Sequence, residues 1–175
     1  MKVTRLVALS LALACFAATA HAKVTRLEIT ARADVAGGKP FGAAGPYEKI
    51  SGKLYFEVDP KAAHNRQIVD LDKAPRNAHG MVEFAADFFI LKPKDMRGAN
   101  GAALIEIPNR GGKAMLRFFD HGRSSPDSTS EEEMGDGFLL RQGFALVWVG
   151  WQFDVPDQPG LLRLIAPVAT DGGKP

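Results

Sequence analysis

The stretch that most constrains the fold of this 175-residue chain runs over residues 101–152. Residues 102–107 and 144–149 are two short apolar runs, each with the length of a strand that is buried on both faces. Between them lie a Gly-rich turn at residues 109–112 and segments of helical character. Because two strands joined by a helical crossover pair in parallel through a right-handed connection, this stretch predicts a parallel strand–helix–strand unit.

The segments around this unit carry the alternating pattern of antiparallel strands. Residues 50–58 alternate between apolar and polar side chains, which predicts one face on the core and one in water. Residues 81–91 alternate in the same way and are expected to pair with them. Residues 24–30 predict a further half-buried strand, and residues 161–168 one more short strand. The predicted fold is α/β, with antiparallel strands leading into a parallel unit.

Short helices are expected within the central stretch. Residues 113–119 predict the first helix, and Ser130 is a candidate cap for a second one whose first turn carries three glutamates. Residues 137–142 predict the firm part of the last helix. Asp136 is a candidate cap for it, and Gly143 is a natural C-terminal stop.

The N-terminus has the pattern of a secretory signal over residues 1–22. Lys2 and Arg5 precede an apolar run rich in Leu and Ala, and a small-x-small cleavage site ends at Ala22. Export to the periplasm or medium is therefore expected, with cleavage after Ala22; a buried core helix is the alternative. Cys15 is the only cysteine, and lipid attachment there would instead anchor the protein to a membrane.

Composition narrows the partners of the mature chain. Loss of Lys2 and Arg5 takes the basic residues from 22 to 20, equal to the 20 acidic residues, so the mature formal charge is zero. This balance argues against nucleic acid or an anionic membrane as a partner. Without Cys15 the mature chain can form no disulfide, thiolate nucleophile or Cys-bound metal site. Outside the N-terminus no apolar stretch is long enough to span a membrane.

Candidate site residues follow the two strands of the parallel unit. In open parallel sheets, ligands bind beyond the carboxyl ends of the strands. Glycine lets the backbone approach a ligand, and backbone N–H groups can stabilise developing negative charge. The loop after the first strand is therefore a candidate oxyanion loop, although an ordinary strand-to-helix turn is the alternative. The oxyanion-loop candidates are Asn109, Arg110, Gly111 and Gly112; the substrate-binding candidates after the second strand are Trp151, Gln152 and Asp154.

Side-chain roles are expected for three of these positions. The guanidinium of Arg110 is expected to pair with an acid such as Asp154 rather than to act on substrate. Trp151 is expected to be open and available for stacking on a sugar, whereas Trp148 is expected to pack in the core.

Other catalytic signals do not form a recognisable set. The mature serines lack the sharp elbow of a G-x-S-x-G motif, so no nucleophile is identified in this chain. The histidines have no metal-binding spacing, and neither a metal nor a cofactor is expected. The residues considered are Ser51, Ser124, Ser125, Ser128 and Ser130, with His64, His79 and His121.

The order strand, Asn-Arg-Gly-Gly loop, helix, strand resembles the third strand, oxyanion loop, first helix and fourth strand of the α/β-hydrolase fold. The two earlier antiparallel strands resemble its opening hairpin. More specifically, most of residues 23–175 resembles the N-terminal third of a family of exported bacterial proteins known as alpha/beta hydrolase domain proteins. The blocks that carry this resemblance are residues 45–49, 55–60, 68–72, 74–77, 82–84 with Phe88, 108–111, 137–139, 148–152 and 167–172.

The resemblance implies an esterase-like, serine-type hydrolase acting on a small molecule, with its nucleophile, acid and histidine further along a longer chain. Only residues 109–112 carry a family role over to this sequence. Residues 23–175 are accordingly expected to be the incomplete N-terminal part of such a domain, truncated at the C-terminus and inactive alone. The alternative is a complete periplasmic β-rich binding module, possibly for carbohydrate, with Trp151 as its platform.

Overall fold

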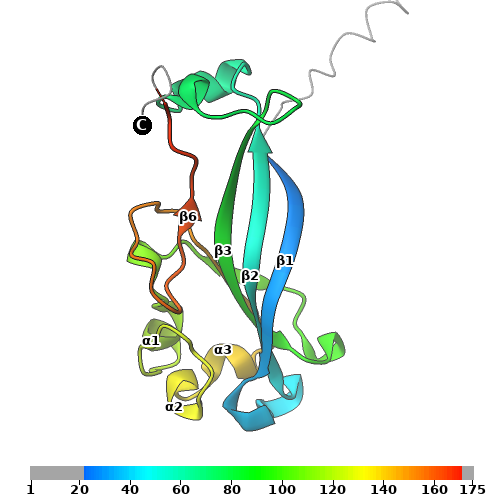
Figure 1. Ribbon diagram of the computed structural model, residues 1–175. Coiled ribbons are helices and arrows are strands. Elements are labelled where there is room, and N and C mark those ends of the chain that lie inside the picture. Colours follow the sequence, from blue (N-terminus) through cyan, green and yellow to red (C-terminus); the bar gives the residue numbers. More distant parts are fainter. Residues whose placement is uncertain (1–21, 171–175) are drawn as a thin grey trace, which may run out of the picture.

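The computed structural model describes residues 22–170, which form a mixed α/β fold around one six-stranded sheet (Figure 1). Its strand order is β1-β2-β3-β5-β4, with β6 also paired to β3. The expected signal segment, apart from Ala22, and Cys15 lie outside the described residues. The strands are β1 (Lys23–Asp34), β2 (Tyr47–Val58), β3 (Val82–Pro93), β4 (Ala103–Glu106), β5 (Ala145–Val149) and β6 (Leu164–Ile165).

The pairing of the strands follows the predicted pattern. β2 and β3 form a long antiparallel pair in which Ile50 lies opposite Ile90, and β1 pairs antiparallel with β2. β4 and β5 are parallel, with Leu104 beside Leu146. The prediction of antiparallel strands leading into a parallel strand–helix–strand unit is therefore confirmed. The predicted strand at residues 161–168 shrinks to the two residues of β6.

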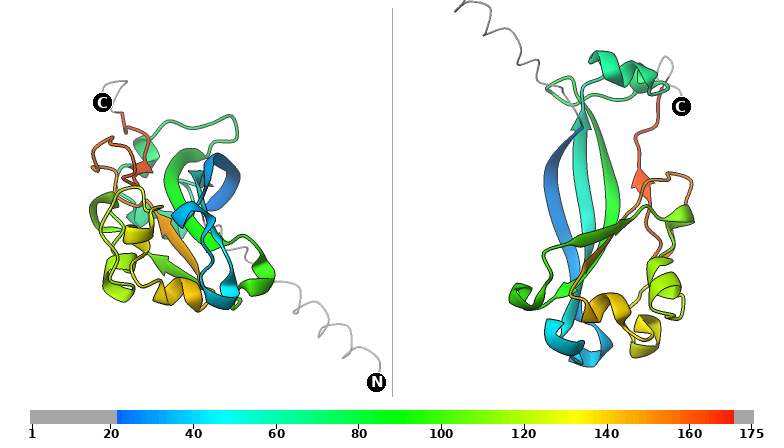
Figure 2. Two further views of the ribbon diagram at one scale, coloured as in Figure 1. Left: turned by 90° about the horizontal axis from the view of Figure 1, so that it is seen from below. Right: turned by 180° about the vertical axis from the view of Figure 1, so that it is seen from behind.

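The three α-helices gather at one end of the long strands (Figures 1 and 2). They are α1 (Met115–Phe119), α2 (Glu131–Met134) and α3 (Phe138–Arg141). At the opposite end, the connection from β2 to β3 forms two 3-10 turns, η3 (Ala63–Gln67) and η4 (Leu71–Lys73). The chain returns to this end after β6, where Thr170 N–H donates to the carbonyl of Lys73 at 3.2 Å.

Three residues that the sequence predicted as helix caps lie next to the ends of α2 and α3. Ser130 and Glu133 form a capping box at the start of α2, in which Ser130 N–H donates to Glu133 Oε2 at 2.7 Å. Asp136 Oδ1 accepts the N–H of Phe138, the first residue of α3, at 2.8 Å, although Gly137 and not Asp136 occupies the N-cap position. Gly143 follows α3 with a φ of +79°, which glycine adopts without the steric cost that a Cβ imposes.

The main core lies between one face of the sheet and these helices. Tyr47, Leu91 and Trp148 are buried on that face, where their side chains meet Met134 and Leu140. Trp148 is fully buried, which confirms the predicted core role. A second, smaller cluster sits near η4 and consists of Val58, Leu71, Ala74, Val82 and Phe84.

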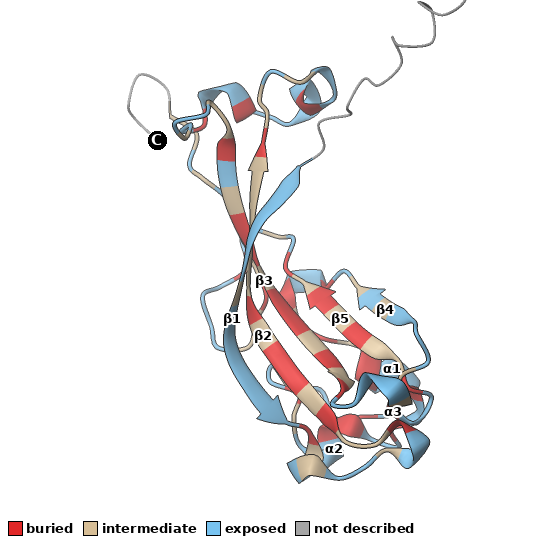
Figure 3. Ribbon diagram, turned by 90° about the vertical axis from the view of Figure 1, so that its right-hand side faces the viewer, coloured by how far each residue is buried: buried red, intermediate tan, exposed pale blue. Residues whose placement is uncertain are grey.

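Two predictions about burial are wrong. β4 was expected to be buried on both faces, but it is an edge strand, and Ile105 is 62% exposed (Figure 3). β1 was expected to be half-buried, but it is exposed along nearly its whole length, again at an edge of the sheet. The sequence pattern shows only which residues are apolar. Whether a strand is buried depends on which strands and helices lie beside it.

Candidate functional site

The loops that follow β4 and β5 lie side by side, because their two strands are parallel neighbours. The first loop is the candidate oxyanion loop at residues 109–112, and the second contains residues 150–154. Every predicted site residue belongs to one of these two loops. The structure therefore brings the predicted site residues together at one edge of the sheet.

The candidate oxyanion loop is bent by two consecutive residues in the left-handed region. Arg110 has a φ of +54° and Gly111 a φ of +75°. Gly111 is also packed tightly, because a Cβ there would lie 2.7 Å from the carbonyl oxygen of Leu162. Its own carbonyl accepts the N–H of Leu162 at 3.0 Å. Only glycine satisfies both the conformation and the packing at position 111.

Three contacts join the two loops. Arg110 N–H donates to Gln152 Oε1 at 2.6 Å, and Trp151 Nε1 donates to the carbonyl of Pro108 at 2.7 Å. The Arg110 guanidinium binds Asp154 twice, at 2.5 Å to Oδ2 and at 3.0 Å to the backbone carbonyl. The predicted pairing of Arg110 with Asp154 is thus confirmed. Both partners are about half exposed, so the pair orders the loops more than it stabilises the fold.

The predicted residues differ in how far they reach solvent. Asn109, Arg110 and Asp154 are exposed, whereas Gly111 is buried and Gly112 and Gln152 are intermediate. Trp151 is 53% exposed, as predicted, and its indole N–H is held by the loop next to it. The ring is therefore fixed while a large part of it remains available for contact.

A cavity of about 330 Å³ lies beside the candidate oxyanion loop. Asn109 and Gly112 contribute to its wall, and Lys113 and Arg117 bring two positive charges that the sequence patterns did not single out. The full lining is Glu106, Asn109, Gly112, Lys113, Ala114, Arg117, Ser124, Ser125, Pro126 and Leu161.

Lys113 is a buried lysine that links three segments. Its ammonium donates to the carbonyl of Pro126 and to that of Gly160, the latter at 2.7 Å, and lies 4.5 Å from the centre of the Phe89 ring. Burial lowers the pKa of Lys113 to about 8, although Asp127 and Glu106 act in the opposite direction. Both carbonyl partners are distant in sequence, so no local pattern marks this lysine.

Glu106 ends β4 on the side that faces the helices. Its carboxylate accepts the N–H groups of Ala114 and Met115 at the start of α1, and also the indole N–H of Trp148. Both carboxylate oxygens of Glu106 therefore accept hydrogen bonds from the protein itself. Glu106 fixes the position of α1 relative to the loop that precedes it.

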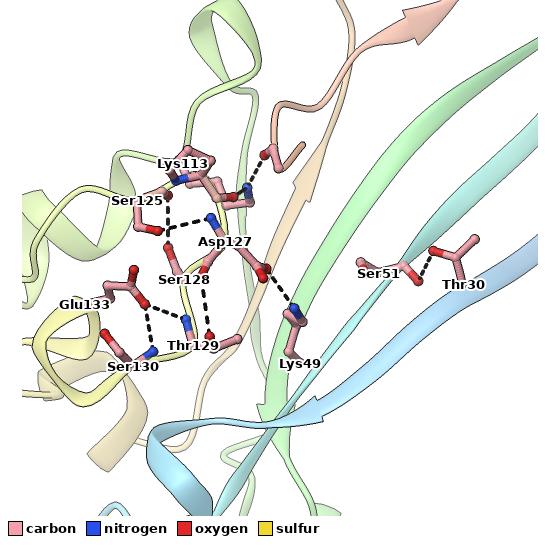
Figure 4. Close-up of polar contacts among 12 residues, drawn as sticks. Thr30, Lys49, Ser51, Lys113, Ser125, Asp127, Ser128, Thr129, Ser130 and Glu133 are labelled. Atoms are coloured by element: carbon pink, nitrogen blue, oxygen red, sulfur yellow. Dashed lines mark hydrogen bonds and ion pairs between the residues drawn. The ribbon is translucent and has the colours of Figure 1, made fainter. Parts of the chain in front are cut away.

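The serine loop at residues 124–130 is held in shape by hydrogen bonds between its own side chains and backbone (Figure 4). Ser125 Oγ accepts the N–H of Asp127 at 3.1 Å, and Ser128 Oγ donates to the carbonyl of Ser125 at 3.3 Å. Burial alone would raise the pKa of Glu133, but the Ser125 hydroxyl and the N–H groups of Ser130 and Thr129 lower it to about 2. Ser125, Ser128 and Ser130 thus have structural partners in the described part of the chain.

A larger groove of about 660 Å³ runs between β2, β3 and the segment around residues 157–163. Three cations line it, and each has a carboxylate partner. Lys49 pairs with Asp127 at 2.7 Å, Lys53 with Asp87 at 2.7 Å and Arg163 with Asp157 at 2.8 Å. The charges of this groove are therefore already compensated within the protein.

Residues 22–170 contain neither a metal-binding cluster nor a helix that could span a membrane. No group of three or more His, Cys, Asp or Glu side chains is placed to hold a metal ion. None of the helices there has the length and apolar character needed to cross a bilayer.

The chain was compared with known proteins in three ways. Neither the protein-family models, nor the curated proteins, nor the solved structures include a match to this chain.

Proposed function

We propose that this chain is the N-terminal portion of an exported, serine-type, esterase-like hydrolase acting on a small molecule. In this proposal, residues 109–112 supply an oxyanion donor, while the nucleophile, the acid and the histidine come from outside residues 22–170. The resemblance in sequence motivates the proposal. The parallel pair of β4 and β5, and the antiparallel pair of β2 and β3 before it, are consistent with it.

One observation carries the proposal furthest. The backbone N–H of Arg110, in the loop that leaves β4, holds the side-chain carbonyl oxygen of Gln152 at 2.6 Å. Oxyanion donors lie at about this distance from the oxygen that they stabilise. In an α/β-hydrolase the second oxyanion donor comes from the loop after the third strand. In the proposed enzyme, the oxygen of a reacting ester would take the position of Gln152 Oε1 and displace it.

The direct test is the gene downstream of codon 175. The proposal expects an open reading frame with a G-x-S-x-G motif about one strand further on. It also expects the purified 175-residue chain to be inactive on short-chain nitrophenyl esters. A stop codon at that point, or clear turnover by the chain itself, would contradict the proposal.

Export is the second part of the proposal. Lys2, Arg5 and the small residues up to Ala22 support cleavage after Ala22. N-terminal sequencing of exported material is expected to begin at Lys23. Recovery of a lipid-bearing N-terminus at Cys15 would replace this proposal with a membrane-anchored lipoprotein.

A second candidate function is carbohydrate binding, favoured by the fixed and half-exposed indole of Trp151. Aromatic rings that are held in place offer contact area at low conformational cost. The chain has two tryptophans, and Trp148 is fully buried, so quenching of the fluorescence by added sugars would report on Trp151. Loss of sugar binding in Trp151→Ala, measured by calorimetry because this variant lacks the reporting indole, would support this candidate, and unchanged binding would rule it out.

A further inference from the structure

The cavity beside the candidate oxyanion loop contains polar groups that the fold does not use. The Asn109 amide, the Arg117 guanidinium and the Ser124 hydroxyl all line it and are exposed. Within residues 22–170, none of the three side chains forms a hydrogen bond or ion pair with another residue. Arg117 instead lies over the ring of Phe118, 4.5 Å from its centre, which restrains the guanidinium without neutralising it.

The charge of this cavity is positive. Lys113 and Arg117 contribute two cations, and Glu106 is the one carboxylate in the lining. Glu106 directs its oxygens to the N–H groups of Ala114, Met115 and Trp148 rather than to either cation. Lys113 donates to two carbonyls, so it adds positive potential but leaves direct binding to Arg117.

The larger groove provides a useful contrast. Its three cations, Lys49, Lys53 and Arg163, each have a carboxylate partner within 2.8 Å. An anion entering that groove would have to compete with these acids. An anion entering the smaller cavity would meet an arginine that no acid of the described chain neutralises.

We propose that the cavity beside residues 109–112 binds the carboxylate of a small monoanionic molecule, with the Arg117 guanidinium as its direct partner. A guanidinium offers two parallel N–H donors that match the two oxygens of a carboxylate. The amide of Asn109 and the hydroxyl of Ser124 supply further donors at the same cavity. The one excess positive charge of the lining matches a monoanion better than a dianion.

The inference rests on the proposed function in one respect. Asn109 and Gly112 belong both to the candidate oxyanion loop and to this cavity. The carboxylate would therefore be a part of the substrate remote from the ester, and it would favour acidic esters over neutral ones. Binding energy from such a remote group can be used to orient the reacting group.

The test is a binding titration that requires no turnover. Benzoate and its neutral analogue benzamide are added to the purified 175-residue chain, and amide chemical shifts are followed by NMR. Benzoate is expected to shift the amides of Gly112, Ser124 and Ser125 saturably, and benzamide is expected to bind at least about tenfold more weakly. Arg117→Gln should lower the affinity for benzoate by about tenfold or more.

A matched control comes from Arg66, in η3 at the opposite end of the long strands. It is also exposed and forms no ion pair with a described carboxylate. Arg66→Gln removes the same charge and should leave benzoate binding unchanged. An equal effect of the two variants would mean that overall charge, not the cavity, attracts the anion, and would overturn the proposal.

Three further outcomes would overturn it. They are equal affinity for benzamide and benzoate, tighter binding of inorganic phosphate than of benzoate, and no saturable shift at millimolar benzoate. These outcomes are separate from those that decide the proposed function. A stop codon after codon 175 would remove the hydrolase proposal and leave carboxylate binding intact, whereas failed binding would not affect the downstream motif.

Discussion

The carboxylate of Glu106 and the indole of Trp148 are direct partners across the parallel pair of strands. Trp148 Nε1 lies 2.5 Å from Glu106 Oε2, and the two residues are also in register between β4 and β5. The same oxygen accepts the N–H of Met115 at 2.8 Å. One side chain therefore joins two strands to the first turn of α1, next to the candidate oxyanion loop.

The first prediction concerns the stability that Glu106 provides. Glu106→Ala should lower the free energy of unfolding by about 2–4 kcal/mol, because three N–H donors lose their acceptor. Glu106→Gln keeps one acceptor oxygen and should cost about 1 kcal/mol. Urea denaturation followed by circular dichroism measures both values. Glu83→Ala removes an exposed glutamate of β3 and is expected to change stability by less than about 0.5 kcal/mol.

A ranking in which Glu106→Ala resembles Glu83→Ala would show that Glu106 does not hold α1. Such a result would also remove the support for a fixed loop at residues 109–112. Because Glu106→Gln removes the charge and keeps one acceptor oxygen, the difference between Glu106→Ala and Glu106→Gln measures what that remaining acceptor contributes.

The second prediction uses two adjacent glycines with different environments. Gly111→Ala should destabilise the protein by about 2 kcal/mol or more, since it combines a positive φ with a Cβ only 2.7 Å from Leu162 O. Gly112 has a φ of −76°, and a Cβ there would lie 3.6 Å from Asn109 O. Gly112→Ala should therefore cost no more than about 0.5 kcal/mol. Equal melting temperatures for the two variants would contradict the described conformation of the loop.

Much of the fold could be predicted from the sequence because the relevant signals are local. The alternation in residues 50–58 and 81–91 predicted β2 and β3 and their pairing. The capping of α2 by Ser130 depends on residues within one turn of one another. Even the pair of Arg110 and Asp154 was predictable, because both residues follow neighbouring parallel strands.

The remaining features depend on contacts between residues that are distant in the sequence. Buried Lys113 donates to the carbonyl of Gly160, which lies 47 positions away in the sequence. Glu106 accepts the indole N–H of Trp148, which lies 42 positions away. Neither contact produces a periodicity or a characteristic residue spacing that could be recognised in the sequence. The exposure of β4 follows from its place at the edge of the sheet, and apolar character alone could not distinguish an edge strand from a central one.

The third prediction concerns the pH dependence of stability and arises from Asp120. This carboxyl is fully buried; Oδ1 accepts the N–H of Leu139, and Oδ2 has no hydrogen-bond partner among the described residues. Burial raises the pKa of Asp120 to about 6, from an ordinary value of 3.8. Between these two values the folded state binds more protons than the unfolded state. Stability should therefore fall as the pH rises from about 4 to about 6, by on the order of 2–3 kcal/mol, and then level off.

Asp120→Asn should remove this slope and be more stable than the parent protein at pH 7. Glu133 gives the opposite sign, because its pKa is lowered to about 2 from 4.5. Its contribution is present above pH 4.5 and is lost as the pH falls toward 2. Unfolding free energies of the parent, Asp120→Asn and Glu133→Gln at pH 3, 5 and 7 test both signs. A parent slope that survives in Asp120→Asn would assign it to another group.

The last prediction concerns the outer edge of β4, which no strand of the described residues covers. Ile105 and Ile107 are each 62% exposed, and Phe118 and Phe119 of α1 are exposed beside Ile105 around a small cavity. An apolar edge strand with unpaired backbone groups is a template for association with another chain. The 175-residue chain should therefore self-associate as its concentration rises, and Ile105→Lys should suppress this, because a charge on an edge strand opposes pairing.

Val69→Lys is the matched control, since Val69 is 85% exposed near η4 at the other end of the strands. Analytical ultracentrifugation of the three proteins measures the outcome, and association that Val69→Lys suppresses as strongly as Ile105→Lys would show that the β4 edge is not the contact.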